Sequence, residues 1–237
     1  KCPNSCKMCC RTYDQCTNDC QLINLTPSEM ARYLHYKYGL DIISNIHELA
    51  IITGSFTNSD EALEYIEMFK ITRGAFDPIN NMHQSIKISS HLFCDDQSMR
   101  KLKKVGAKRF MYSIEMISNE RKQVMDSEYN KKGNPNLHKI KEILAMAIDI
   151  WGNACIEPVY IVGLDSFAQT MEWIECLKEM GINHLTRSLY NVYSASQSKY
   201  YRMTLEEIIR TIQVINREFR TGYRQIIKNN SYISNKC

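Results

Sequence analysis

Six of the ten cysteines in this chain lie within its first twenty residues. Three of them, Cys2, Cys6 and Cys9, have the spacing C-x3-C-x2-C. Thiolates are soft ligands that suit iron–sulfur clusters and zinc. Three thiolates can hold three irons of a cubane cluster and leave the fourth iron without a protein ligand. The spacing therefore predicts a metal site on these three residues.

A structural zinc site is the alternative interpretation of the same region. Zinc in structural sites takes four ligands in a tetrahedral array, often from two close pairs of cysteines. Cys6 and Cys9 could form one such pair, and Cys16 and Cys20 the other. Cys16 and Cys20 could instead hold a second metal site or be free thiols. Cys10 is expected to be a bystander, because adjacent thiolates seldom point into one cluster.

The distribution of the cysteines also indicates the compartment. A disulfide scaffold spreads its cysteines through a short, loop-rich secreted chain. Here the cysteine cluster is followed by over two hundred cysteine-poor residues with a regular pattern. This arrangement favours metal binding in a reducing compartment, and we expect a cytoplasmic protein. Cys94, Cys155 and Cys176 are expected to be small core residues.

The composition fits one globular domain. The chain has 237 residues, 44% of them hydrophobic, which suffices for a sizeable core. Its net charge of +4, from 30 basic and 26 acidic residues, is a mild excess. A nucleic-acid-binding protein usually concentrates basic residues on one face, so nucleic acid is not an expected partner. No stretch is apolar for the roughly 18 residues that a membrane span needs, so no membrane contact is expected.

Short apolar runs alternate with helical patterns about five times along the chain. The predicted strands are 48–53, 84–89, 109–114, 156–162 and 184–189. The predicted helices are 26–38, 60–72, 95–105, 136–151, 166–180 and 204–220. Ser59 is the predicted cap of the second helix, and glycines end several of the others.

Repeated β-α units with short apolar strands predict parallel strands joined by right-handed helical crossovers. A closed or partial β/α barrel and an open doubly wound sheet both fit this pattern. In either fold the active site lies at the carboxyl ends of the strands. We expect a first strand to have been trimmed from before the cysteines. We expect one domain over 1–225 and a polar, mobile tail over 226–237.

A C-x3-C-x2-C triplet directly before β/α repeats resembles the radical S-adenosylmethionine (SAM) superfamily, and in shape its biotin-synthase-like branch. The resemblance covers residues 2 to about 220. It implies a partial (β/α)6-type TIM barrel and a [4Fe-4S] cluster on Cys2, Cys6 and Cys9. It implies that SAM binds the open iron and is cleaved reductively to a 5′-deoxyadenosyl radical that takes hydrogen from a substrate.

The implied partners follow from that chemistry. They are a small-molecule substrate, such as a metabolite or cofactor precursor, and a one-electron donor such as flavodoxin or ferredoxin. The protein would hold the substrate against the radical and exclude water and oxygen.

The resemblance also implies which residues contact SAM. Gly54 and Ser55 stand where the family holds the SAM amino group with its backbone; Gly54 matches, whereas Ser55 and Phe56 depart from the pattern. Glu115 matches the carboxylate that contacts the ribose or the amino group. A carboxylate at the end of a buried strand is poorly placed for core packing, so a role in the site is physically reasonable.

A basic residue early in the following helix is matched to the SAM carboxylate in relatives. Lys139 stands at this position. Relatives commonly carry arginine there, and a lysine lacks the bidentate fork of that side chain. His138 or Arg121 could serve instead.

The segment 159–165 resembles the family's G-x-I-x-G-x-x segment, which packs near adenine. Ile161 and Gly163 match it. Met8 stands before the third cysteine, where the family usually has an aromatic residue near adenine, and its sulfur can still pack against a ring. Arg187 and Asn191 follow the last predicted strand, where they could face the substrate or anchor a loop.

A second function fits the same residues. The departures at Ser55, Phe56 and Met8 would also suit a catalytically inactive iron–sulfur or zinc-binding protein on the same fold. Formation of 5′-deoxyadenosine from SAM would support the enzyme, and its absence from a protein with a loaded cluster would support the inactive protein.

Overall fold

A computed structural model describes residues 27–39, 48–52, 58–76, 83–88, 93–118, 136–190 and 203–219 of the chain. Several predictions fall outside them. They concern the six N-terminal cysteines, Met8, Gly54, Ser55, Arg121, Asn191 and the tail over 226–237.

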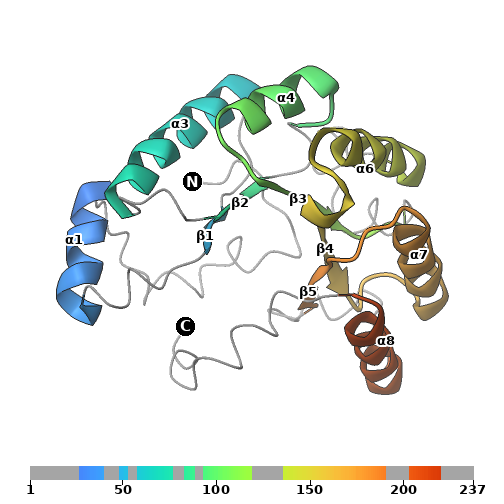
Figure 1. Ribbon diagram of the computed structural model, residues 1–237. Coiled ribbons are helices and arrows are strands. Elements are labelled where there is room, and N and C mark those ends of the chain that lie inside the picture. Colours follow the sequence, from blue (N-terminus) through green and yellow to red (C-terminus); the bar gives the residue numbers. More distant parts are fainter. Residues whose placement is uncertain are drawn as a thin grey trace.

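A five-stranded parallel sheet lies at the centre of the molecule (Figure 1). Its strands are β1 (Glu48–Ile52), β2 (His83–Ile88), β3 (Arg109–Glu115), β4 (Ile156–Val162) and β5 (Thr186–Leu189). They are hydrogen-bonded in chain order, from β1 to β5. A doubly wound sheet requires a reversal of strand order, whereas a β/α barrel does not. The order therefore selects the partial β/α barrel of the two predicted architectures.

The helices form an arc along one face of the sheet (Figure 1). They are α1 (Pro27–Tyr38), α3 (Ser59–Phe76), α4 (Asp96–Lys104), α6 (Leu137–Trp151), α7 (Phe167–Glu179) and α8 (Leu205–Glu218), with a short 3-10 helix, η4 (Asn153–Cys155). None of the described helices is long and apolar enough to cross a membrane.

Side chains buried between the sheet and the helices form the core. Six residues on one face of β3 and β4 pack into it: Phe110, Tyr112, Ile114, Ile156, Tyr160 and Val162. Helix α6 contributes four residues of its predicted apolar side, each at most 1% exposed: Ile140, Ile143, Leu144 and Ala147. Burying one such apolar side chain contributes about 1.5–3 kcal/mol, so this layer fixes the position of the strands.

Side-chain caps define where the helices begin. Asn136, Ser166 and Thr204 each accept a hydrogen bond from the backbone N–H three residues later. The prediction that Ser59 caps α3 is wrong. The cap is Asn58, whose Oδ1 accepts the N–H of Glu61 at 2.7 Å, and Ser59 is the first helical residue.

Two glycines with positive φ allow a matched test of the helix ends. Gly152 (φ 83°) and Gly181 (φ 71°) follow α6 and α7. A Cβ at Gly152 would meet nothing within 4 Å, whereas one at Gly181 would overlap the amide nitrogen of Asn153. That nitrogen donates to the carbonyl of Met180 at 3.0 Å.

We expect Gly152→Ala to lower the free energy of unfolding by about 1–3 kcal/mol, because φ 83° with ψ 152° is a backbone region essentially restricted to glycine. Gly181→Ala should cost about 0.5–1.5 kcal/mol more, because the Asn153 hydrogen bond is also lost. Urea titrations of the two variants measure the difference. Equal costs would show that Asn153 moves aside freely.

Candidate cofactor site

The carboxyl ends of β3, β4 and β5 lie side by side at one edge of the sheet, because the three strands are parallel and paired. In a β/α barrel this edge carries the active site. The predicted residues Glu115, Ile161 and Gly163 all belong to it. The structure therefore has these three positions at the strand ends where the sequence predicted them, and their contact with SAM stays a prediction.

Glu115 ends β3 in a strained turn. Its φ is 61°, and the N–H of Met116 donates to the carbonyl of Ile114 at 2.7 Å, which makes a γ-turn centred on Glu115. The pairing with β4 shifts register between Ser113 and Glu115. A positive φ is rare for glutamate, and such strain persists where the surroundings impose it, often at functional sites. The turn therefore sets the position of the half-buried Glu115 carboxylate at the edge of the sheet.

A buried carboxylate holds this turn in place. Asp165 is 0% exposed. Its Oδ1 accepts the N–H of Ser118 at 2.9 Å, and its Oδ2 accepts the N–H of Ile117 at 2.9 Å and the hydroxyl of Tyr160 at 2.7 Å. A buried carboxylate requires such donors, because its charge is costly away from water. Asp165 thus ties the segment after β3 to the segment after β4.

The hydrogen bonds continue into helix α7. The Tyr160 hydroxyl lies 2.9 Å from Oγ1 of Thr170, which in turn donates to the carbonyl of Ser166 at 2.9 Å. Asp165 therefore joins the segments at the carboxyl edge, and it was not among the residues predicted for the site. The signal was available, because Asp165 is a carboxylate after a buried strand, as Glu115 is.

Gly163 follows β4 with a φ of 107°. A Cβ there would lie 3.5 Å from Cβ of Tyr190 and 4.0 Å from Cδ1 of Ile208. These are ordinary contact distances, so the backbone conformation is what requires glycine. Ile161 lies two residues before Gly163, within β4. Its side chain is half-buried and lies on the face of the sheet opposite the core.

Lys139 lies in the first turn of α6, on the solvent side. Its Nζ is 3.0 Å from Oε2 of Glu142, and this hydrogen bond raises the pKa of Lys139. His138 contacts the other oxygen of Glu142 at 3.2 Å. Lys139 and His138, the two described candidates for binding the SAM carboxylate, therefore both contact one exposed glutamate. Binding of SAM by either residue stays a prediction.

Arg187 lies within β5 and does not follow it as predicted. Its register partner in β4 is Tyr160, which is buried in the core. Partners on parallel strands point to the same face, so Arg187 lies on the helix-covered face. Burial lowers the pKa of the Arg187 guanidinium. This position does not suit contact with a substrate inside the barrel.

A second polar cluster lies at the opposite edge of the sheet. Nη2 of Arg109 is 3.3 Å from Oε2 of Glu157, and the hydroxyl of Thr186 donates to Oε1 of the same glutamate. The three residues stand at or near the starts of β3, β4 and β5. Conserved or buried polar residues at the amino edge of a β/α barrel contribute to stability and not to the active site. We therefore assign this cluster the role of joining the three strands, apart from the candidate site.

The described cysteines are not placed as metal ligands. Within the described ranges, no group of three or more His, Cys, Asp or Glu side chains could hold a metal ion. Cys176 is buried in α7, as predicted for a core residue, and burial raises the pKa of its thiol. Cys94 and Cys155 are half-buried, and of the two only Cys94 packs against the core, so the prediction of a core residue is wrong for Cys155.

A pair of substitutions separates the strain at Glu115 from its carboxylate. We expect Glu115→Gly to raise the free energy of unfolding by about 1 kcal/mol relative to Glu115→Ala, because glycine adopts a positive φ without strain. Both variants should bind SAM about tenfold more weakly than the wild type, since a hydrogen bond to a charged group contributes about 1.5–3 kcal/mol.

Calorimetric titration of the reconstituted protein with SAM measures the affinity, and urea unfolding measures the stability. Unchanged SAM affinity in both variants would refute the role of the carboxylate.

Comparisons with known proteins bear on the fold. A scan against protein-family models found no match, and neither did a search of the curated proteins. Among solved structures, the chain is similar to HydG, a maturase of the [FeFe]-hydrogenase, with a TM-score of 0.62 and 13% identity over 93% of this chain and 48% of that one. It is also similar to a radical SAM methyltransferase from Sphaerobacter thermophilus, with a TM-score of 0.52 and 12% identity over 84% of this chain and 57% of that one.

The chain spans about half the length of these two structures. Identities this low show a shared fold and say nothing of the reaction. The methyltransferase is a radical SAM enzyme by its name, and the biotin-synthase-like branch is not singled out. The chain therefore has the fold of the radical SAM enzymes, as its cysteine spacing and β/α repeats predicted.

Proposed function

We propose that this chain is the core of a radical SAM enzyme that acts on a small metabolite or cofactor precursor. Cys2, Cys6 and Cys9 would hold a [4Fe-4S] cluster. The observation that carries the proposal is their C-x3-C-x2-C spacing ahead of a barrel that radical SAM enzymes share. When bound, SAM and the reduced cluster supply a 5′-deoxyadenosyl radical that abstracts hydrogen from the substrate.

The residues at the carboxyl edge fit SAM in their chemistry. A carboxylate only accepts hydrogen bonds, and the ribose hydroxyls and the amino group of SAM donate them, so Glu115 suits either group. Ile161 offers a half-buried apolar side chain to adenine. Asp165 and Tyr160 hold the segments that carry these two residues at a fixed separation.

The remaining assignments rest on the resemblance alone. Gly54 and Ser55 would bind the SAM amino group, Lys139 its carboxylate, and Met8 would pack near adenine. Lys139 would have to leave Glu142 to do so. A one-electron donor such as flavodoxin or ferredoxin, and a cytoplasmic location, complete the proposal.

Anaerobic reconstitution with iron and sulfide tests the proposal. We expect about four irons per chain, an EPR signal of the reduced cluster that changes on addition of SAM, and 5′-deoxyadenosine after addition of dithionite. About eight irons would bring Cys16 and Cys20 into a second cluster. A loaded cluster that leaves SAM intact would support the inactive metal protein, and stoichiometric zinc without iron uptake would eliminate the enzyme.

A further inference from the structure

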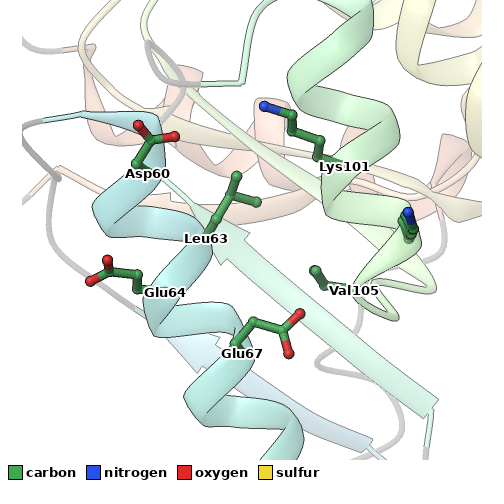
Figure 2. Close-up of a pocket in the computed structure, with 7 residues that line it drawn as sticks. Asp60, Leu63, Glu64, Glu67, Lys101 and Val105 are labelled. Atoms are coloured by element: carbon green, nitrogen blue, oxygen red, sulfur yellow. The ribbon is translucent and has the colours of Figure 1, made fainter.

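A groove of about 600 Å³ separates helices α3 and α4 on the outer face of the barrel (Figure 2). We call it the α3/α4 groove. It is lined by Asp60, Leu63, Glu64, Glu67, Lys101, Lys104 and Val105. Both helices bury other residues against the sheet, so the groove is the place where they do not meet each other. It lies outside the candidate cofactor site and does not depend on it.

The floor of the groove is apolar. Leu63 lies between the two helices, and Val105 closes the lower end beside α4 (Figure 2). Both side chains are only partly buried, although both pack against the core. An apolar hollow of this kind gains free energy when a second apolar surface covers it.

The two walls of the groove carry opposite charges. Asp60, Glu64 and Glu67 of α3 form the acidic wall, at positions i, i+4 and i+7. Lys101 and Lys104 of α4 form the basic wall, and Lys101 extends toward α3 (Figure 2). The acidic residues therefore follow one line along α3 over two turns, about 10.5 Å.

Most of these charges have no ion-pair partner in the described part of the chain, although Lys101 interacts electrostatically with Asp95. Glu67 pairs with Lys70 at 2.9 Å, on its own helix. Among the described residues, no ion pair within 4.0 Å involves the other two carboxylates, Asp60 and Glu64, or the two lysines, Lys101 and Lys104. The walls face each other without closing the groove, so their charges remain for a bound partner.

We propose that the α3/α4 groove docks an amphipathic helix of a partner protein, with an apolar ridge between one basic and one acidic edge. Charges spaced one helical turn apart match a helix that lies parallel to the groove. The acidic wall disfavours a nucleic acid or an anionic membrane, since both carry negative charge. The basic wall disfavours a helix that is basic on both edges.

A synthetic helix provides the probe. It has about 18 residues, or 27 Å, with leucines at i, i+4, i+7 and i+11, arginines along one edge and glutamates along the other. Fluorescence anisotropy of the labelled peptide with the full chain should give a dissociation constant on the order of 10 µM, as for a small transient interface. A peptide with serines in place of the leucines is the control for the apolar ridge.

Two variants of the chain test the groove itself. Glu64→Lys should weaken binding of the mixed-charge peptide about tenfold, which corresponds to about 1.4 kcal/mol, and should strengthen binding of a peptide with glutamates on both edges. Leu63→Ser should weaken both by a similar factor. Glu172→Lys, the same charge reversal on the exposed side of α7, should leave binding unchanged.

Circular dichroism confirms that each variant is folded, and Glu64 is exposed, so its replacement leaves the core intact. Absence of saturable binding by the wild-type chain up to about 1 mM peptide would overturn the proposal. Equal binding by the wild type and Glu64→Lys would overturn it as well.

Discussion

Replacement of Cys2, Cys6 and Cys9 together by alanine is expected to remove all bound iron from the reconstituted protein. A cubane held by three thiolates has no other protein ligands, so the variant should fall from about four irons to none. The reduced-cluster EPR signal and the formation of 5′-deoxyadenosine should disappear with the iron. Iron analysis, EPR and chromatography of the reaction mixture measure the three losses.

The matched control removes the same number of thiols elsewhere. A variant with Cys10, Cys94 and Cys155 replaced by alanine should keep its iron, because none of these residues belongs to the C-x3-C-x2-C triplet. Retention of iron by the first variant, or loss of iron from the control, would show that other cysteines hold the cluster.

Asp165→Ala is expected to give the largest loss of stability among single substitutions at the carboxyl edge. It removes the acceptor of two buried backbone donors, the N–H groups of Ile117 and Ser118, and one of the two hydrogen-bond partners of the Tyr160 hydroxyl. Each orphaned buried group costs about 1–3 kcal/mol, so a total of about 2–6 kcal/mol is expected. For a chain of this size, that corresponds to a fall in Tm of about 10 °C.

Differential scanning calorimetry measures that fall, and two comparisons locate its cause. Asp165→Asn should cost less than alanine, because its amide oxygen still accepts hydrogen bonds. Asp149→Asn, on the exposed side of α6, should shift Tm by less than about 1 °C. A shift for Asp165→Ala as small as that for Asp149→Asn would mean that water replaces the carboxylate.

Tyr160→Phe provides an independent check on the same network. In a double-mutant cycle with Asp165→Ala, we expect a coupling free energy of about 1 kcal/mol, because the two side chains are in direct contact. Additive effects would show that the Tyr160 hydroxyl contributes to stability through its contact with Thr170 and not through Asp165.

The order and type of the elements could be predicted because each follows from local pattern. The apolar period of residues 136–151 predicted the range of α6 and the side that it buries. The cap of α3 was misassigned, because Asn58 and Ser59 are both good caps and the sequence does not distinguish them. Strand β5 is two residues shorter than predicted, because its first residues, including the core residue Leu185, precede the regular pairing with β4.

The candidate site was only partly predictable, because its geometry depends on contacts between distant residues. The position of Glu115 at a strand end followed from the sequence, but its γ-turn and positive φ did not. Asp165 reaches Ile117 and Ser118 across 48 and 47 residues, and no local pattern encodes such a contact. The β/α repeats alone did not distinguish the barrel from a doubly wound sheet; the family resemblance implied the barrel, and the pairing order confirmed it.

The sequential strand order has a consequence for the synthesis of the protein. Each strand pairs with the one before it, so the sheet can grow by one β/α unit at a time as the chain leaves the ribosome. The turn at Glu115 is an exception, because Asp165, which fixes the segment after it, is made about 50 residues later. At 5–20 residues per second the delay is roughly 2–10 s. The cofactor edge can thus be fixed only after β4 and Asp165 have been made, and a nascent chain that stalls between β3 and β4 would lack a fixed binding edge.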